Sequence, residues 1–193
     1  LMRPNLGNRI LRIAETAVPV LEEVDVLVAG GGTAGAPAAI GAARQGAKTL
    51  VVEYLHGLGG TGTLGMIGRY WYGHREGFTS EIDREVKGMA AEDHPRQRRW
   101  QHEWPIDWKM EWYRREIRKA GGEIWFGVMA TGAFVQDGQV KGVLVATPEG
   151  RGVILAKQII DATGSADVAI AAGAGYEYVD GESVAVQGSG LPK

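Results

Sequence analysis

The stretch that decides the fold is VDVLVAGGGTAGAPAAIGAARQGAKTLVVE, residues 24–53. A short, Val-rich run at 24–29 predicts a buried β-strand that ends at a run of glycines. The Ala-rich segment 33–45 predicts a helix that stops near Gly46, and the apolar run 48–53 predicts a second buried strand. Strand, glycine turn, helix and strand in this order predict a βαβ unit of a parallel sheet.

The glycines between the first strand and the helix follow the pattern Gly30-x-Gly32-x-x-Gly35. In such a pattern the first glycine permits a sharp turn, the second lets backbone approach a pyrophosphate, and the third lets the helix pack closely on the sheet. Free N–H groups at the helix N-terminus bind phosphate oxygens. Glu53, at the end of the second strand, can accept both hydroxyls of an adenosine ribose. We therefore expect a dinucleotide site here, with a purely structural turn as the alternative.

The rest of the chain lacks the regular βα alternation of a nicotinamide-binding domain. A second Gly-rich loop at 56–68 precedes a helix expected near 80–91 and a firmer helix at 105–120. Residues 123–157 contain short β-runs separated by turn signals, and they predict a three-stranded meander. An apolar run at 157–164 is expected to return to the parallel sheet, before one more helix.

This order resembles FAD-dependent oxidoreductases with a glutathione-reductase-like Rossmann domain, nearest to the broad group that also resembles fumarate reductase flavoprotein subunits. The resemblance rests on residues 24–53, on LGGTGTLGMIG at 58–68 and on IDATG at 160–164, and it covers most of residues 24–175. It implies an α/β fold, in which a Rossmann-like parallel sheet carries a three-stranded β-meander insertion. It also implies FAD as the cofactor.

The resemblance implies a role for each motif. The first glycine loop would lie against the FAD pyrophosphate and Glu53 would hold the ribose. The second loop would run along the pyrophosphate and ribityl chain, and the IDATG turn would pass close to the cofactor, with Asp167 approaching through water or backbone. A flexible loop and an ordinary strand-to-helix turn are the respective alternatives. The cofactor-binding residues expected are Gly30, Gly32, Thr33, Ala34, Gly35, Glu53, Gly59, Gly60, Thr61, Ala162, Thr163, Gly164 and Asp167.

The expected domain organisation follows from the same resemblance. Residues 1–23 are a lead-in, and 24–178 form the FAD-binding domain, with a helical segment at about 76–120 and the meander at about 123–157 inserted. Residues 179–193 would begin a missing or separate substrate domain. Since flavoproteins of this group run much longer, we expect a fragment, a split subunit or a processed chain.

Four tryptophans recur at every fourth position: Trp100, Trp104, Trp108 and Trp112. Pro105 interrupts any single helix through them, so two lie inside the helix at 105–120. Helical periodicity gives that helix one apolar stripe: Ile106, Met110, Tyr113 and Ile117. We expect Trp108 and Trp112 to point away from this stripe. They would then contact a missing domain or partner chain, with substrate stacking as the alternative.

No catalytic residue is identified. Four side chains after the second Gly-rich loop could reach the flavin, bind a substrate carboxylate or move a proton, or be plain loop residues: Arg69, Tyr70, His74 and Arg75. His56 is expected near the ribose rather than as a covalent flavin attachment. His94 and His102 lack a third ligand at metal spacing, so we expect no metal.

Composition narrows the functional class. A net charge of −2 gives no hint of a nucleic-acid surface, and no apolar run is long enough to span a membrane. The absence of cysteine suits a cytoplasmic protein. We expect an FAD-dependent oxidoreductase that moves a hydride or an electron pair from a small organic substrate to flavin. The alternatives are a non-catalytic FAD- or nucleotide-binding subunit needing a partner chain, and an NAD-binding or thiazole-synthase-like protein.

Overall fold

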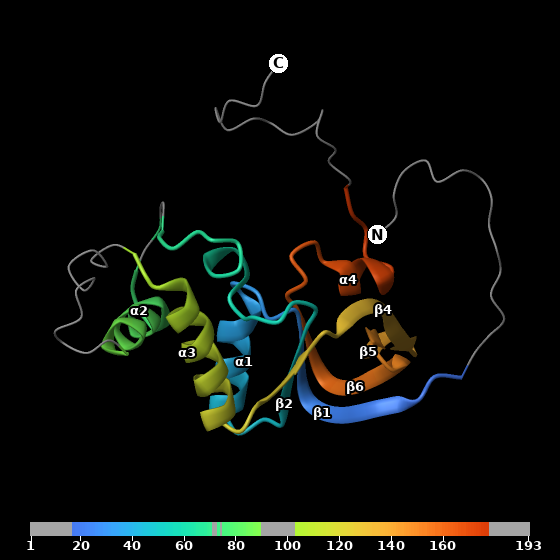
Figure 1. Cartoon of the computed structure of the whole chain (residues 1–193). Coiled ribbons are helices and arrows are strands. Elements are labelled where there is room, and N and C mark those ends of the chain that lie inside the picture. Colours follow the sequence, from blue (N-terminus) through green and yellow to red (C-terminus); the bar gives the residue numbers. More distant parts are fainter. Residues whose placement is uncertain (1–16, 71–72, 74, 90–102, 178–193) are drawn as a thin grey trace, which may run out of the picture.

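One sheet organises the described part of the chain, with its six strands in the order β3-β2-β1-β6-β5-β4 (Figure 1). The computed structural model describes residues 17–70, 73, 75–89 and 103–177. The strands are β1 (Val20–Ala29), β2 (Thr49–Glu53), β3 (Glu123–Phe126), β4 (Met129–Gln136), β5 (Gln139–Thr147) and β6 (Gly150–Asp161). The helices are α1 (Gly35–Arg44), α2 (Phe78–Gly88), α3 (Ile106–Lys119) and α4 (Asp167–Ala171), with a 3-10 turn, η1, at Gly60–Gly62.

The parallel half of the sheet confirms the βαβ unit. β1 pairs in parallel with β2 on one side, where Val28 lies opposite Val51, and with β6 on the other, where it lies opposite Ile160. Strands in such a position are buried on both faces, which is why their sequences are apolar runs rather than alternating patterns. β1 begins at Val20, before the predicted Val24, because the long β6 continues the pairing down to Val153.

The meander is confirmed, but its predicted bounds are wrong. β4, β5 and β6 pair antiparallel, and the turn between the first two has positive φ at Asp137 (51°) and Gly138 (72°), as a tight hairpin requires. Residues 123–126 instead form β3, a parallel edge strand on β2. No break occurs near residue 157, since β6 is both the third strand of the meander and the parallel neighbour of β1.

Helices cover the two faces of the sheet unequally. α1, α2 and α3 lie together on one side, whereas α4 lies against β4 on the other (Figure 1). Alternate strand residues serve the two layers: Val28 and Val51 belong to the apolar cluster under α1–α3, and Leu27 and Leu50 to the cluster under α4 and the meander. The three predicted helices at 33–45, 80–91 and 105–120 are confirmed in position: α1 and α3 lie within the predicted ranges, and α2 begins earlier, at Phe78.

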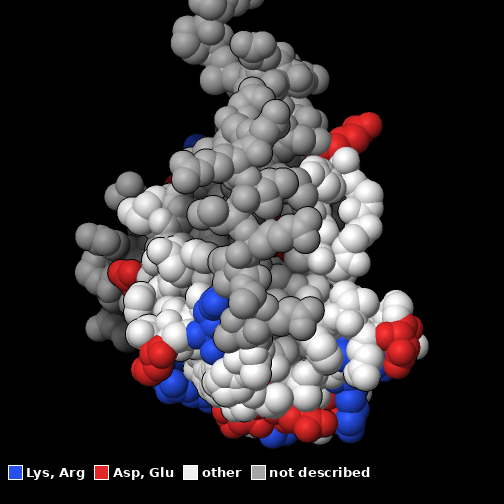
Figure 2. Space-filling view, turned by 90° about the vertical axis from the view of Figure 1, so that its right-hand side faces the viewer, with Lys and Arg blue, Asp and Glu red and all other residues white. Residues whose placement is uncertain are grey.

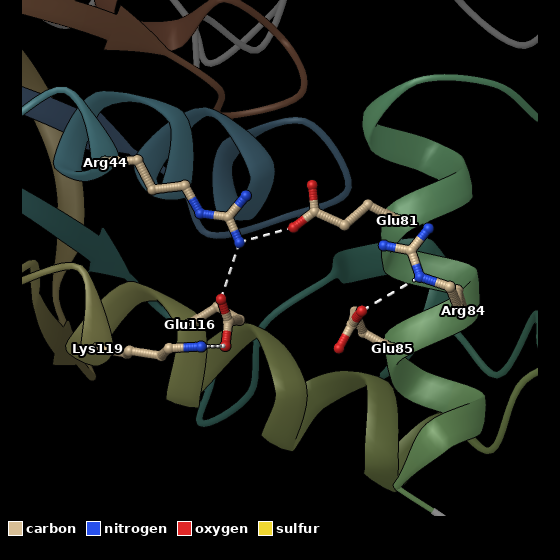
Figure 3. Close-up of polar contacts among 6 residues, drawn as sticks. All are labelled: Arg44, Glu81, Arg84, Glu85, Glu116 and Lys119. Carbon is tan, nitrogen blue, oxygen red and sulfur yellow. Dashed lines mark hydrogen bonds and ion pairs between the residues drawn. The ribbon is translucent and has the colours of Figure 1, made fainter.

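Arg44 joins the three helices of the first layer. Its guanidinium forms ion pairs with Glu81 on α2 and Glu116 on α3 (Figure 3), at distances of 2.7 and 2.8 Å from the two carboxylates. It also lies 5.3 Å from the centre of the Phe78 ring. Since Arg44 is the last residue of α1, its positive charge also suits the helix C-terminus.

The expected exposure of the α3 tryptophans is wrong. Trp112 is only 5% exposed, and its ring packs against those of Phe78 and Tyr113, with ring centres 6.3 and 5.6 Å away. Trp108 is half-buried against the same cluster. The reason is that α2 packs on the side of α3 that the periodicity left without a neighbour. Trp112 therefore offers no free surface for a partner chain, and Trp100 lies outside the described residues.

The surface carries charges of both signs. Figure 2 shows acidic and basic side chains interspersed along the lower rim of the meander side. No helix in the described ranges combines the length and the apolar character that crossing a bilayer requires.

Candidate functional site: two glycine loops at the end of the parallel strands

The first glycine loop, residues 30–35, turns sharply out of β1 and is closed on its inner side. Gly30 has φ = 100°, and its amide donates to the carbonyl of Val52 at 2.8 Å. A Cβ at Gly30 would lie 2.4 Å from the carbonyl oxygen of Ala162, and one at Gly35 would lie 1.8 Å from that of Gly30. These two positions exclude any side chain because strand ends and helix press against them.

The outer side of the same loop is open. A Cβ at Gly32 would meet no heavy atom within 4 Å, and Thr33 and Ala34 are exposed. α1 begins without a side-chain cap, and its first turn holds no acidic residue. The amides of this turn therefore have no carboxylate of their own helix as a partner, which is the arrangement that binds anions at helix N-termini.

Glu53 reaches the loop from the end of β2. One carboxylate oxygen accepts the amide of Gly31 at 2.7 Å, and the other accepts the amide of Leu55 at 2.8 Å. Each carboxylate oxygen has a second lone pair, so both can still accept a hydroxyl. Sequence reasoning placed Glu53 beside the loop; the structure adds that it also helps to hold the loop in shape.

The second glycine loop, residues 56–68, lies directly on the first. The amide of Gly59 donates to the carbonyl of Gly31 at 2.8 Å, and the hydroxyl of Thr33 donates to the carbonyl of Gly59 at 3.0 Å. A Cβ at Gly60 would lie 3.0 Å from the Cα of Gly32. Thr61, next along the loop, is exposed. The structure thus brings two segments that are far apart in sequence to one place.

α3 forms the floor under the second glycine loop. A Cβ at Gly57 would lie 2.7 Å from the sulfur of Met110, and one at Gly59 would lie 3.0 Å from the ring of Tyr113. Gly59 also has φ = 96°. The backbone conformation and the neighbouring side chains thus favour glycine at 59, whereas a side chain at 57 would require the Met110 side chain to shift.

The turn after β6 is held by Asp161. Its carboxylate accepts the amide and hydroxyl of Thr163 at 3.2 and 2.7 Å and the amide of Ala169 at 2.9 Å. Burial raises the pKa of Asp161, but these hydrogen bonds together outweigh burial and bring it below its ordinary value. Sequence reasoning did not single out Asp161, although an Asp two residues before a Thr at a strand end signals such a turn.

The four predicted residues of this turn, Ala162, Thr163, Gly164 and Asp167, make different contacts. The amide of Ala162 donates to the carbonyl of Ala29 at 2.9 Å, which puts Ala162 beside the first loop. The hydroxyl of Thr163 accepts the amide of Asp167 at 2.9 Å. Gly164 is exposed, with φ = 90°. The described hydrogen bonds of Thr163 and Asp167 thus lie within the turn that leads into α4, and the Thr163 amide nitrogen also borders the first loop, 3.2 Å from where a Cβ at Gly30 would lie.

Lys109 is the functional candidate that sequence reasoning missed. It is only 4% exposed, and its ammonium nitrogen lies 3.4 Å from the centre of the Trp104 indole. The hydroxyl of Tyr70 lies 3.5 Å away, near the limit of a hydrogen bond. Burial lowers the pKa of Lys109 to about 8, with Asp83 raising it and Arg75 lowering it by smaller amounts. Its position one turn before the core residue Tyr113 is the signal that could have found it.

The other side chains that the sequence suggested as catalytic or binding candidates do not form one cluster in the described structure. Arg75 forms an ion pair with Asp83 at 2.8 Å, Arg69 is exposed on a bridge to Glu103, and His56 stacks on Phe126. His74, His94 and His102 lie outside the described residues. Within the described ranges no three His, Asp or Glu side chains gather as metal ligands would. A groove of about 620 Å³ runs between residues 66–69 and 103–107.

Comparison with known proteins agrees with this geometry. Residues 25–188 match the family model described as FAD dependent oxidoreductase. No curated protein matches the chain.

Solved structures share the fold at low identity. THI4 of Thermovibrio ammonificans is 24% identical with a TM-score of 0.57, over 77% of this chain and 61% of that one. A geranylgeranyl bacteriochlorophyll reductase-like protein of Thermoplasma acidophilum is 23% identical with the same TM-score, over 79% and 42%. L-proline dehydrogenase of P. horikoshii is 13% identical at 0.54, over 81% and 57%. These likenesses show the fold alone, and this chain spans less than two thirds of each structure.

Proposed function

The chain belongs to the FAD dependent oxidoreductase family, and from this premise we propose that it binds FAD across the two glycine loops. It would form the FAD-binding part of an enzyme that takes a hydride or an electron pair from a small organic substrate. When bound, the flavin supplies the redox chemistry, while the protein binds and orients it.

The observation that carries this proposal is the contrast among the three glycines of the first loop. Side chains at Gly30 and Gly35 would collide with backbone, so those glycines are explained by the fold itself. Gly32 has no neighbour within 4 Å of a Cβ, so the fold does not require glycine there. A ligand that must approach the backbone closely does require it.

The residues present fit FAD. The uncapped amides at the start of α1, next to Gly32, Thr33 and Ala34, would hold the diphosphate. Glu53 would accept the ribose hydroxyls with the lone pairs that Gly31 and Leu55 leave over. Gly60, Thr61 and Ala162 would border the cofactor further along, where the second loop and the end of β6 meet the first loop.

The experiment compares Gly32→Leu with Gly41→Leu in the full chain. Gly41 lies in α1, is exposed, and would likewise carry a Cβ that meets nothing within 4 Å, so it is a matched control. Gly32→Leu should weaken FAD binding about tenfold to 100-fold, because overpacking costs about 1–3 kcal/mol. Fluorescence titration gives the Kd and thermal melting checks the fold. Unchanged FAD affinity in Gly32→Leu would refute the proposal, as would tight binding of NAD in place of FAD.

A further inference from the structure

Lys109, Trp104 and Gly62 form a chain of contacts behind the second glycine loop. The Lys109 ammonium lies on the face of the Trp104 indole, and the indole N–H donates to the carbonyl of Gly62 at 2.6 Å. Gly62 ends the short helix that begins at Gly60, the residue that packs on Gly32. The contacts Lys109–Trp104 and Trp104–Gly62 thus join a buried charge to the second glycine loop, and the contact Gly60–Gly32 joins that loop to the first.

The charge on Lys109 is not explained by the packing around it. In the described residues no carboxylate forms an ion pair with Lys109, and its three donors have Tyr70 as their nearby acceptor. Asp83, the acid that acts on it, is already paired with Arg75. A buried, unpaired ammonium opposes folding, whereas methionine would fill the same space without a charge.

We propose that Lys109 is a positioning residue for FAD binding. Its protonated ammonium, acting through the Trp104 indole, holds Gly62 and therefore keeps the second glycine loop packed on Gly32 and Thr33. The FAD part of this inference rests on the function proposed above, whereas the effect on the loop does not.

The physical basis is the attraction between a cation and an aromatic face, which is strongest for tryptophan. A cation over the ring also polarises the indole, so the N–H becomes a better donor to the Gly62 carbonyl. Loss of the proton from Lys109 removes both effects. The titratable neighbours Tyr70 and Tyr113 have pKa values raised by burial, and Arg75 and Asp83 are ion-paired with each other. Lys109 is therefore the group of this cluster that changes charge near pH 8.

The first experiment measures amide hydrogen exchange of residues 57–68 in the full chain without FAD, at pH 7. Lys109→Met should speed exchange of the loop amides about 30-fold, the size expected for losing a desolvated cation–π contact. Lys109→Arg should restore protection, and Lys119→Met, an exposed lysine on the same helix, should change nothing. Trp104→Phe keeps a ring but loses the N–H, so it should loosen the loop as Lys109→Met does.

The second experiment measures the Kd for FAD between pH 7 and pH 9.5. The wild-type Kd should rise about tenfold over this range, which corresponds to FAD raising the pKa of Lys109 by about one unit. Lys109→Met should bind weakly at every pH, and Lys109→Arg should bind tightly at every pH, because guanidinium keeps its proton.

The outcomes separate this inference from the proposed function. If no variant binds FAD, the proposed function fails, while loop exchange still tests the role of Lys109. Unchanged exchange in Lys109→Met overturns the inference. So does an altered Kd with unaltered exchange, because the charge would then attract FAD directly rather than position the loop.

Discussion

Arg44 and Lys109 are cations of the same helical layer, but they differ in burial and in their ion pairs. Arg44 is partly exposed and lies within 2.8 Å of two carboxylates, on Glu81 and Glu116. Lys109 is nearly fully buried, and no ion pair joins it to any described residue. Each lies over aromatic rings: Arg44 over Phe78, and Lys109 over Trp104 and Tyr70.

The pKa shifts of the two side chains indicate which of the two charges stabilises the fold. The hydrogen bonds that the Arg44 guanidinium donates to Glu81 and then to Glu116 raise the pKa of Arg44, so folding favours its charged form. Burial lowers the pKa of Lys109, so folding disfavours its charged form. A residue that opposes folding and is still built into the core is better explained by function than by stability.

The largest expected effect is a pH dependence that belongs to Lys109. Its pKa is about 8 in the native state against 10.5 for the ordinary side chain, so between these values the unfolded chain binds more protons. Stability should therefore rise with pH through this window. The full gain is about 3.5 kcal/mol, from about 1.4 kcal/mol for each of the 2.5 pKa units. Urea unfolding of wild type and Lys109→Met from pH 7 to pH 10 measures it, and parallel curves for the two proteins would contradict it.

The second prediction concerns Arg44→Met. This change removes the ion pairs that Arg44 on α1 forms with Glu81 on α2 and Glu116 on α3. Glu116, whose side chain is 15% exposed, then keeps Lys119 as its described partner. The free energy of unfolding should fall by about 1–2 kcal/mol, more than for an exposed pair because Glu116 is mostly buried. A double-mutant cycle with Glu116→Gln in urea checks it. Zero coupling energy would show that Arg44 does not join these helices.

The third prediction is that the same substitution at Lys109 has the opposite effect on stability. Lys109→Met should raise the free energy of unfolding at pH 7 by about 1 kcal/mol, since removing the buried charge outweighs losing the contacts with Trp104 and Tyr70. Chemical denaturation at pH 7 measures the change. A loss of stability comparable to that of Arg44→Met would remove the distinction between the two sites.

The smallest expected effect provides the baseline. Arg84 lies on α2, is 68% exposed and forms an ion pair with its sequence neighbour Glu85 at 3.3 Å (Figure 3). Arg84→Met should change stability by no more than about 0.5 kcal/mol, since solvent screens such pairs. A larger loss would mean that removing any charge from these helices lowers the free energy of unfolding, and Arg84→Met could then not serve as the control for Arg44→Met.

Local patterns were enough to predict the βαβ unit of β1, α1 and β2 and the position of the first glycine loop. The run from Val24 to Glu53 carries its own strand, turn and helix signals, and Asp137-Gly138 specifies a hairpin by its backbone preferences. Residues 123–126 were misplaced in the meander because nothing within a short β-run says which strand it will pair with. Trp112 was misjudged for the same reason, since its environment depends on α2.

The sequence by itself determined the βαβ unit and the first glycine loop, because these depend on residue preferences and spacing within about thirty positions, and the order of three motifs along the chain indicated the family. Only the tertiary structure decided that a Cβ at Gly32 would face open space while one at Gly35 would collide with backbone, and that α3 underlies the second loop. It also decided that Lys109 is buried and that no carboxylate among the described residues forms an ion pair with it. Burial and charge pairing are properties of contacts between distant segments, so no single segment carries them in its own residues.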